Sequence, residues 1–91
     1  MNDYFEGSVR QHLERGRRLL TRIPRNLPRE FHLLAQNCER DVGSILDQLE
    51  TLLSDARMRS APYQPERLRQ FRRRVREMNY LEVFGIAALE R

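Results

Sequence analysis

A long, regular apolar stripe in the middle of the chain constrains the fold more than any other feature. Its members alternate steps of four and three residues over more than three heptads: Phe31, Ala35, Cys38, Val42, Ile45, Leu49, Leu52 and Ala56. This spacing keeps side chains on one face of an α helix. Leu34, Leu46 and Leu53 widen the stripe, as suits a helix covered by two neighbours. The pattern predicts a long central helix at 28–58.

Two further segments with helical apolar spacing flank the central one. Prolines separate the three segments: Pro24, Pro28, Pro62 and Pro65. We therefore expect helices over about 4–23 and 65–78, with residues 60–64 as a linker. Gly16 lies on the apolar stripe of the first segment, where it would let a neighbouring helix approach closely.

The C-terminal stretch is open to two interpretations. Asn79 interrupts the third segment, and Asn79 and Glu82 have the spacing of a capping box. Either the third helix continues with a kink, or a short fourth helix covers 80–90. This stretch is apolar on most of its circumference and needs more cover than one helix gives. It would dock deeply, join a partner, or be followed by more chain in a longer protein.

Together these patterns predict a single all-α domain over 1–91, an antiparallel three-helix bundle with or without a short fourth helix. At a rise of about 1.5 Å per residue the stripe alone spans about 39 Å, so we expect an elongated molecule. No apolar run approaches the roughly 20 residues of a membrane span, and the start of the chain lacks a secretory signal. Cys38 is the only cysteine, which fits a reducing, cytoplasmic setting.

Charge is distributed by segment. All 17 basic residues are Arg, and the net charge is +4. Residues 1–25 hold six Arg and three acids, residues 30–55 one Arg and six acids, and residues 66–77 six Arg and two acids. An acidic helix between two basic ones would neutralise much of the basic excess inside the fold.

Two groups of residues form the candidate binding surface. Four arginines share one arc of the third helix: Arg69, Arg72, Arg73 and Arg76. The C-terminal stretch adds an apolar surface: Tyr80, Leu81, Phe84 and Ile86. An apolar patch with a charged rim is typical of a partner-binding site. We therefore predict a non-catalytic module for protein–protein interaction or oligomerisation.

The expected partner is a protein that presents acidic groups or a second copy of the chain. Self-association as a homodimer is expected because the long stripe and the apolar C-terminal stretch exceed what one small core covers. An arginine-rich nucleic-acid binder is the alternative, since a guanidinium face can follow phosphates. The chain offers no means of reading bases, so such binding would be weak.

Catalytic chemistry has little support in the sequence. His32 and Cys38 are six residues apart, which places them on different faces of a helix, and Cys38 lies on the core stripe. The two histidines, His12 and His32, and Cys38 lack the short spacings of a zinc site. No phosphate-binding loop or nucleophile elbow is present, and no cofactor or metal is expected.

One short motif resembles a ribonuclease signature. Arg25 and His32 are separated by six residues, a spacing similar to the Arg, four to six residues, His motif of the helical HEPN ribonucleases. The resemblance covers eight residues, and it implies RNA cleavage as a remote alternative function.

Overall fold

The computed structural model describes residues 3–58 and 65–90, and nearly all of them are helical. The long elements are three helices: α1 (Asp3–Arg22), α2 (His32–Met58) and α3 (Pro65–Tyr80). Three short segments complete the described chain: the 3₁₀ turn η1 (Arg29–Phe31), the π-helical η2 (Leu81–Ile86) and α4 (Ala87–Leu89). The all-α prediction is confirmed. The expected linker at 60–64 and the side chain of Ala56 lie outside the described residues.

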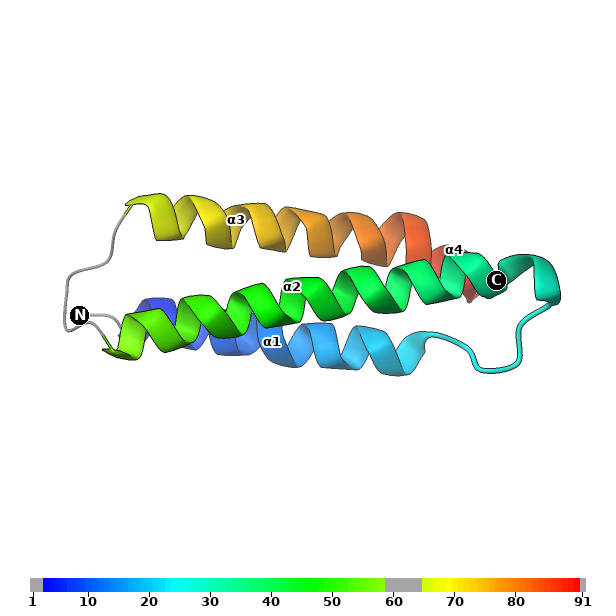
Figure 1. Cartoon of the computed structure of the whole chain (residues 1–91), viewed down its shortest axis with the longest axis horizontal. Helices are drawn as coiled ribbons and strands as arrows, with labels where there is room; N and C mark the ends of the chain where they lie inside the picture. The colour runs from blue at the N-terminus through cyan, green and yellow to red at the C-terminus, as the bar shows by residue number, and fades with distance from the viewer. Residues whose placement is uncertain (1–2, 59–64, 91) are drawn as a thin grey trace.

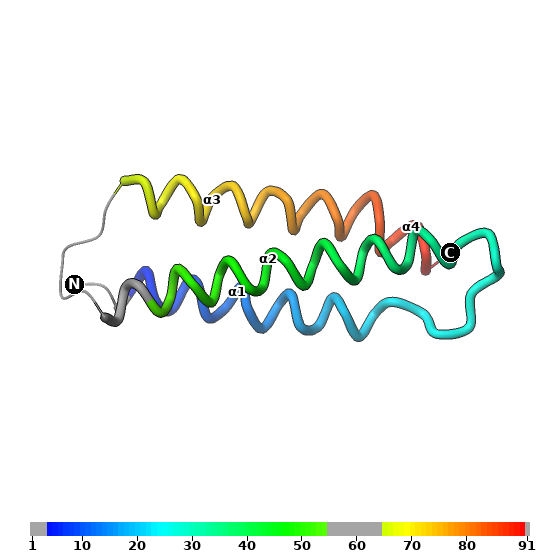
Figure 2. The backbone as a smooth tube through the Cα atoms, viewed as in Figure 1, coloured from blue at the N-terminus to red at the C-terminus, as the bar shows by residue number. Residues whose placement is uncertain are grey.

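Each long helix runs antiparallel to the one before it in the sequence, and all three lie along a common axis (Figure 1). The molecule measures 49 × 18 × 16 Å, which confirms the predicted elongated bundle. Its C-terminus lies at the same end of the bundle as the start of α2, as the backbone trace also shows (Figure 2). Within residues 3–58 and 65–90, no helix combines the length and apolar character needed to cross a membrane.

The apolar stripe of α2 forms the centre of the core. Cys38, Val42, Ile45, Leu49 and Leu52 are all buried, Val42 and Leu49 completely. Buried side chains from the other helices pack around them: Val9, Leu13, Leu19, Ile23, Phe71, Met78, Ile86 and Leu89. Full burial of one such side chain contributes about 1.5–3 kcal/mol, so this cluster is the main source of stability.

Two glycines allow close contacts between elements. A Cβ on Gly16 would lie 2.5 Å from Leu46 Cδ2, and a Cβ on Gly85 would lie 2.7 Å from Cys38 Sγ. Both distances are shorter than an ordinary van der Waals contact. Gly16 therefore lets α1 approach α2 closely, as the sequence predicts, and Gly85 does the same for η2.

The helix of α3 continues past Asn79 into the C-terminal segment. Tyr80 has helical backbone angles, φ −61° and ψ −47°, so the first of the two sequence interpretations is the one found, with the short α4 at its end. Asn79 does not cap a new helix; its Oδ1 accepts a hydrogen bond from Arg15 Nη2 at 2.6 Å. A π turn takes in more residues than an α turn, which brings Met78 and Ile86 to the same buried side.

Candidate interaction surface

Exposed large hydrophobic side chains are concentrated at one end of the bundle. The described residues hold seven of them, and six lie where α2 starts and the chain ends: Phe31, Leu33, Leu34, Tyr80, Val83 and Phe84. We call these six residues the apolar end. The seventh, Tyr4, lies at the opposite end, at the start of α1 (Figure 1).

The C-terminal segment presents two adjacent aromatic rings to solvent, tilted by 39° to each other. Tyr80 is 64% exposed and Phe84 65%, and their ring centroids lie 4.9 Å apart. Leu81 is partly buried and packs against the core, whereas Ile86 is completely buried and belongs to the core. Ile86 therefore cannot be part of the predicted docking surface. Val83, which the sequence analysis left out, is exposed beside the two rings instead.

Ion pairs hold the other side of this segment against α1. Glu82 accepts hydrogen bonds from Arg15 Nη2 at 2.6 Å and from Arg22 Nη1 at 2.7 Å, and Glu90 accepts one from Arg22 Nη2 at 2.6 Å. The bond from Arg15, and then that from Arg22, lowers the pKa of Glu82; the bond from Arg22 lowers the pKa of Glu90. The same contacts, with Glu90 first, raise the pKa of Arg22. These contacts fix the rotation of the segment, so that Tyr80 and Phe84 stay exposed.

The end of η1 and the first turn of α2 supply the rest of the apolar end. Leu33 is 68% exposed, and Phe31 and Leu34 are 40% and 38% exposed. The apolar spacing predicts Phe31 and Leu34 in or beside the core stripe, and for these two residues the prediction is wrong. The stripe pattern is correct, but at its first turn α2 extends beyond the last residue of α1 and has a loop, not a helix, beside it (Figure 1).

The predicted basic face lies on the outer side of α3. All four of its arginines are exposed, and we call them the arginine strip: Arg69, Arg72, Arg73 and Arg76. Arg69 bonds Glu66 at 2.8 Å, while the other three have no ion pair with any described carboxylate. Arg73 and Arg76 precede Tyr80 by seven and four residues, so they share its face of the helix. The strip thus leads directly into the apolar end.

Two arginines of the same run point elsewhere. Arg67 is buried at 8% exposure, with its stem on the core side of α3. Arg74 is largely covered, with a side chain 15% exposed, and pairs with Glu77 at 2.9 Å. The predicted arc of the arginine strip therefore contains exposed arginines and correctly leaves out Arg67 and Arg74.

A groove runs between α2 and α3. Two hollows of about 300 and 290 Å³ form it, and Gln48 and Arg74 line both of them. Asp41 and Tyr80 also line the first hollow, and Arg73 also lines the second. The linings give the relative level of the two helices: Tyr80 lies level with Asp41, and Arg73 lies level with Gln48.

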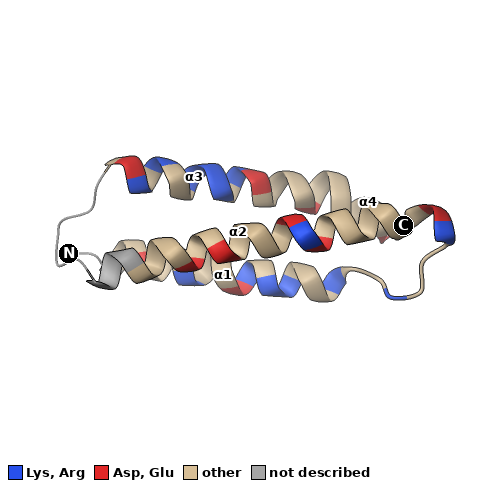
Figure 3. Ribbon diagram, viewed as in Figure 1, with Lys and Arg blue, Asp and Glu red and all other residues tan. Residues whose placement is uncertain are grey.

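The acidic residues of α2 do not neutralise the basic helices as the sequence analysis expected. Among the described residues, the one ion pair that joins α2 to another helix is Arg17–Glu50, which is exposed and spans 3.4 Å. The arginines of α1 instead bind carboxylates of the C-terminal segment. The exposed acids of α2 and the arginine strip therefore both remain accessible to solvent. Figure 3 shows acidic positions along α2 and basic positions along α3.

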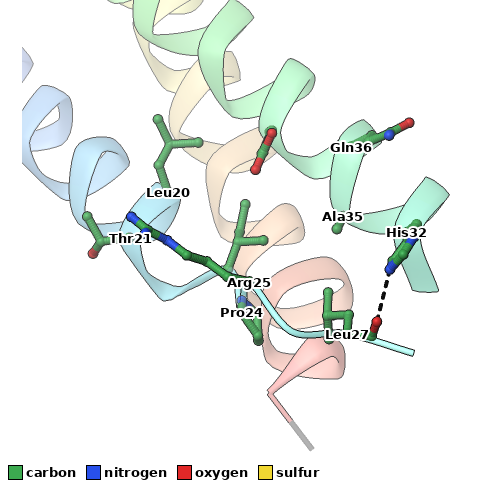
Figure 4. A pocket seen from close by; sticks show the side chains of 10 residues that line it. Leu20, Thr21, Pro24, Arg25, Leu27, His32, Ala35 and Gln36 are labelled. Carbon is green, nitrogen blue, oxygen red and sulfur yellow. Dashed lines mark hydrogen bonds between the residues drawn. The ribbon is translucent and has the colours of Figure 1, made fainter. Parts of the chain in front are cut away.

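A separate cleft of about 560 Å³ lies between the end of α1 and the start of α2. Arg25 and His32, the two residues of the ribonuclease-like motif, both line it (Figure 4). His32 Nε2 lies 2.9 Å from the carbonyl oxygen of Leu27, and that contact holds the ring against the loop. The structure thus brings Arg25 and His32 to one cleft. Cleavage of RNA there remains the remote alternative that the spacing implies.

Cys38 behaves as a core residue, as predicted. It is 2% exposed, and burial, together with the charge of Asp41, raises the pKa of its thiol. Its sulfur is directed to Gly85 across the α2 and η2 contact. Within the part of the chain that the structure describes, no group of three or more His, Cys, Asp or Glu is arranged to hold a metal ion.

Comparison with known protein families, with curated proteins and with solved structures gives no match. The fold and the surface therefore define the class to which the chain belongs: an elongated three-helix bundle with one apolar end and a basic strip that leads into it.

Proposed function

We propose that this chain is a non-catalytic helical interaction module that docks a protein partner through its apolar end. The carrying observation is the concentration of six of the seven exposed large hydrophobics at one end. Single exposed hydrophobics are common on any protein surface, but a cluster rimmed by charge is typical of an interface. Tyr and Arg are also the residues most enriched among those that dominate binding energy.

We propose a second copy of the chain as the partner. An aromatic side chain carries about 150–250 Å² of surface, so the exposed parts of six large side chains offer several hundred Å². A standard interface buries about 800 Å² per partner, of which rather more than half is apolar. The same molecule also carries both the exposed acids of α2 and the unpaired arginines of the strip. A cytoplasmic setting fits the single buried thiol of Cys38.

Single-stranded nucleic acid is the competing partner, and one observation favours it. The arginine strip leads into the adjacent rings of Tyr80 and Phe84, and proteins that bind single strands combine basic tracks with aromatic rings. Such binding would be submicromolar and would weaken steeply with salt. Our proposal expects only weak binding of DNA or RNA, at about 10–100 μM in physiological salt.

Sedimentation velocity at tens of micromolar tests the proposal. We expect the unaltered protein to be dimeric and Phe84→Asp to be monomeric, because a carboxylate within the apolar end must be desolvated on association. Tyr4→Asp is the matched control, since Tyr4 is an aromatic residue 88% exposed at the opposite end. It should leave the dimer intact, and circular dichroism should show equal helicity for all three proteins. A monomeric unaltered protein, or equal effects of the two substitutions, would refute the proposal.

A further inference from the structure

We infer that the two copies associate around a twofold axis parallel to the helices, with Arg73 of each copy facing Asp47 of the other. This inference rests on the proposed self-association. Arg73 and Asp47 are both exposed, and neither has an ion pair among residues 3–58 and 65–90. They therefore supply one unpaired charge of each sign on adjacent helices of the same molecule.

The register of α2 and α3 brings these charges together. A twofold axis parallel to the helices leaves the height of every residue along the axis unchanged. It can therefore place α3 of one copy opposite α2 of the other, with the same residues level as within one copy. Gln48 and Arg74 line both hollows and so lie level where the two hollows meet. Arg73 is the residue next to Arg74, and Asp47 is the residue next to Gln48. Arg73 of one copy thus lies level with Asp47 of the second. In a twofold dimer this contact occurs twice.

The same arrangement brings the two apolar ends together. Tyr80 lies level with Asp41, and Phe84 and Leu34 lie one and two turns further toward the end of the bundle on their own helices. The aromatic rings of one copy then lie opposite the first three turns of α2 in the other. An axis perpendicular to the helices at the middle of the bundle would instead set the apolar end against the end that carries Tyr4, where the described residues offer no comparable cluster. Burial of apolar surface favours the parallel arrangement.

Local ion pairs explain the choice of Arg73 and Asp47 among their neighbours. Arg69 is held by Glu66 at 2.8 Å, and Asp41 lies 3.4 Å from Arg40. Arg73 and Asp47 form no ion pair within the described residues. The pKa of Glu66 is lowered first by its hydrogen bond from Arg69, and the charge of Arg73 is the smallest of the causes. Electrostatic pairing of this kind sets the register of an interface more than its affinity.

A charge-exchange experiment tests this register. In a dimer of Arg73→Glu, a glutamate faces Asp47 at both contacts, and in a dimer of Asp47→Arg, an arginine faces Arg73 at both contacts. The dimer dissociation constant of each variant alone should therefore rise by about tenfold or more. Mixing the two variants should restore association, because both contacts of the mixed dimer then join opposite charges. The double variant in one chain should also dimerise with nearly the affinity of the unaltered protein. Arg10→Glu, an exposed charge reversal on α1, is the control and should have little effect.

The outcomes separate this inference from the proposal on which it rests. Restored dimerisation in the mixture, read by sedimentation velocity, supports the parallel register. If the unaltered protein dimerises and Phe84→Asp abolishes the dimer, but mixing restores nothing, the register is wrong and the docking surface stands. If the unaltered protein is monomeric at tens of micromolar, the parallel register and the proposed self-association are both wrong. Circular dichroism on every variant confirms that helicity is unchanged.

Discussion

Gly85 determines how closely the C-terminal segment approaches α2. A Cβ there would lie 2.7 Å from the sulfur of Cys38, which is buried and short and has little room to move. We expect Gly85→Ala to lower the free energy of unfolding by about 1–3 kcal/mol, even though alanine has the higher helix propensity. Urea denaturation followed by circular dichroism measures the change.

Gly43→Ala is the matched control for this prediction. A Cβ on Gly43 would have no neighbour within 4 Å, so the substitution should raise the free energy of unfolding by up to about 1 kcal/mol. Cys38→Ala should also relieve most of the cost of Gly85→Ala, since it removes the sulfur that the new methyl group would meet. Equal stabilisation by the two glycine substitutions would contradict the close contact.

His12 makes stability depend on pH. Its Nδ1 is buried without a hydrogen-bond partner among the described residues, and its ring lies edge-on to Phe71 at 5.4 Å. Burial, with the charge of Arg15 as a second cause, lowers the pKa of His12 below its usual 6.5. The unfolded chain therefore binds the proton more readily, so the stability from the neutral ring is complete above pH 6.5 and is lost as the pH falls below that value.

We therefore expect the free energy of unfolding to decrease from about pH 7 to about pH 5, and His12→Leu to reduce that decrease. Urea denaturation at a series of pH values measures it. The carboxylates Glu82 and Glu90 have lowered pKa values and so remain ionised through this range. An identical pH dependence in the two proteins would show that His12 is not the group responsible.

At the scale of elements, Glu82 couples the C-terminal segment to α1. It accepts hydrogen bonds from both Arg15 and Arg22, and these bonds lower its pKa. We expect Glu82→Gln to lower the free energy of unfolding by about 1 kcal/mol at neutral pH. The lowered pKa means that this contribution is present above the usual 4.5 and is lost as the pH falls through the folded value.

The difference between the unaltered protein and Glu82→Gln should therefore shrink under acid conditions. Chemical denaturation between neutral and acid pH measures it. Glu14→Gln, which changes an exposed carboxylate on α1, is the control and should have an effect of less than about 0.5 kcal/mol at any pH. A difference for Glu82→Gln that does not depend on pH would show that the ion pairs are not its source.

The sequence predicts the elements well where a periodic pattern has a neighbour to pack on. The stripe of α2 is buried from Cys38 to Leu52 because helices cover it on two sides. The same pattern fails at Phe31, since periodicity identifies a face but not where cover ends. Ile86 could not be placed either, because a π-helical segment changes the rotation of the residues that follow, and no local sequence signal announced it.

At the scale of the whole molecule, the shape separates two surfaces with different chemistry. The bundle is 49 Å long, and its apolar end is remote from the start of α1. The charged residues on the outer sides of α2 and α3 have opposite signs and are mostly not paired with each other among the described residues. Segment-wise charge counts predicted the signs. They could not predict that the arginines of α1 would bind the C-terminal carboxylates.

Amide chemical shifts recorded during dilution test the central claim most directly, because they locate an association as well as detect it. Between about 500 μM and about 5 μM, a range that spans typical affinities of modest interfaces, we predict concentration-dependent shifts at 31–34 and 80–84, with smaller ones near Asp47 and Arg73. Residues around Tyr4 and Val9 should not change. Shifts that are independent of concentration, or that cluster at the start of α1, would contradict docking through the apolar end.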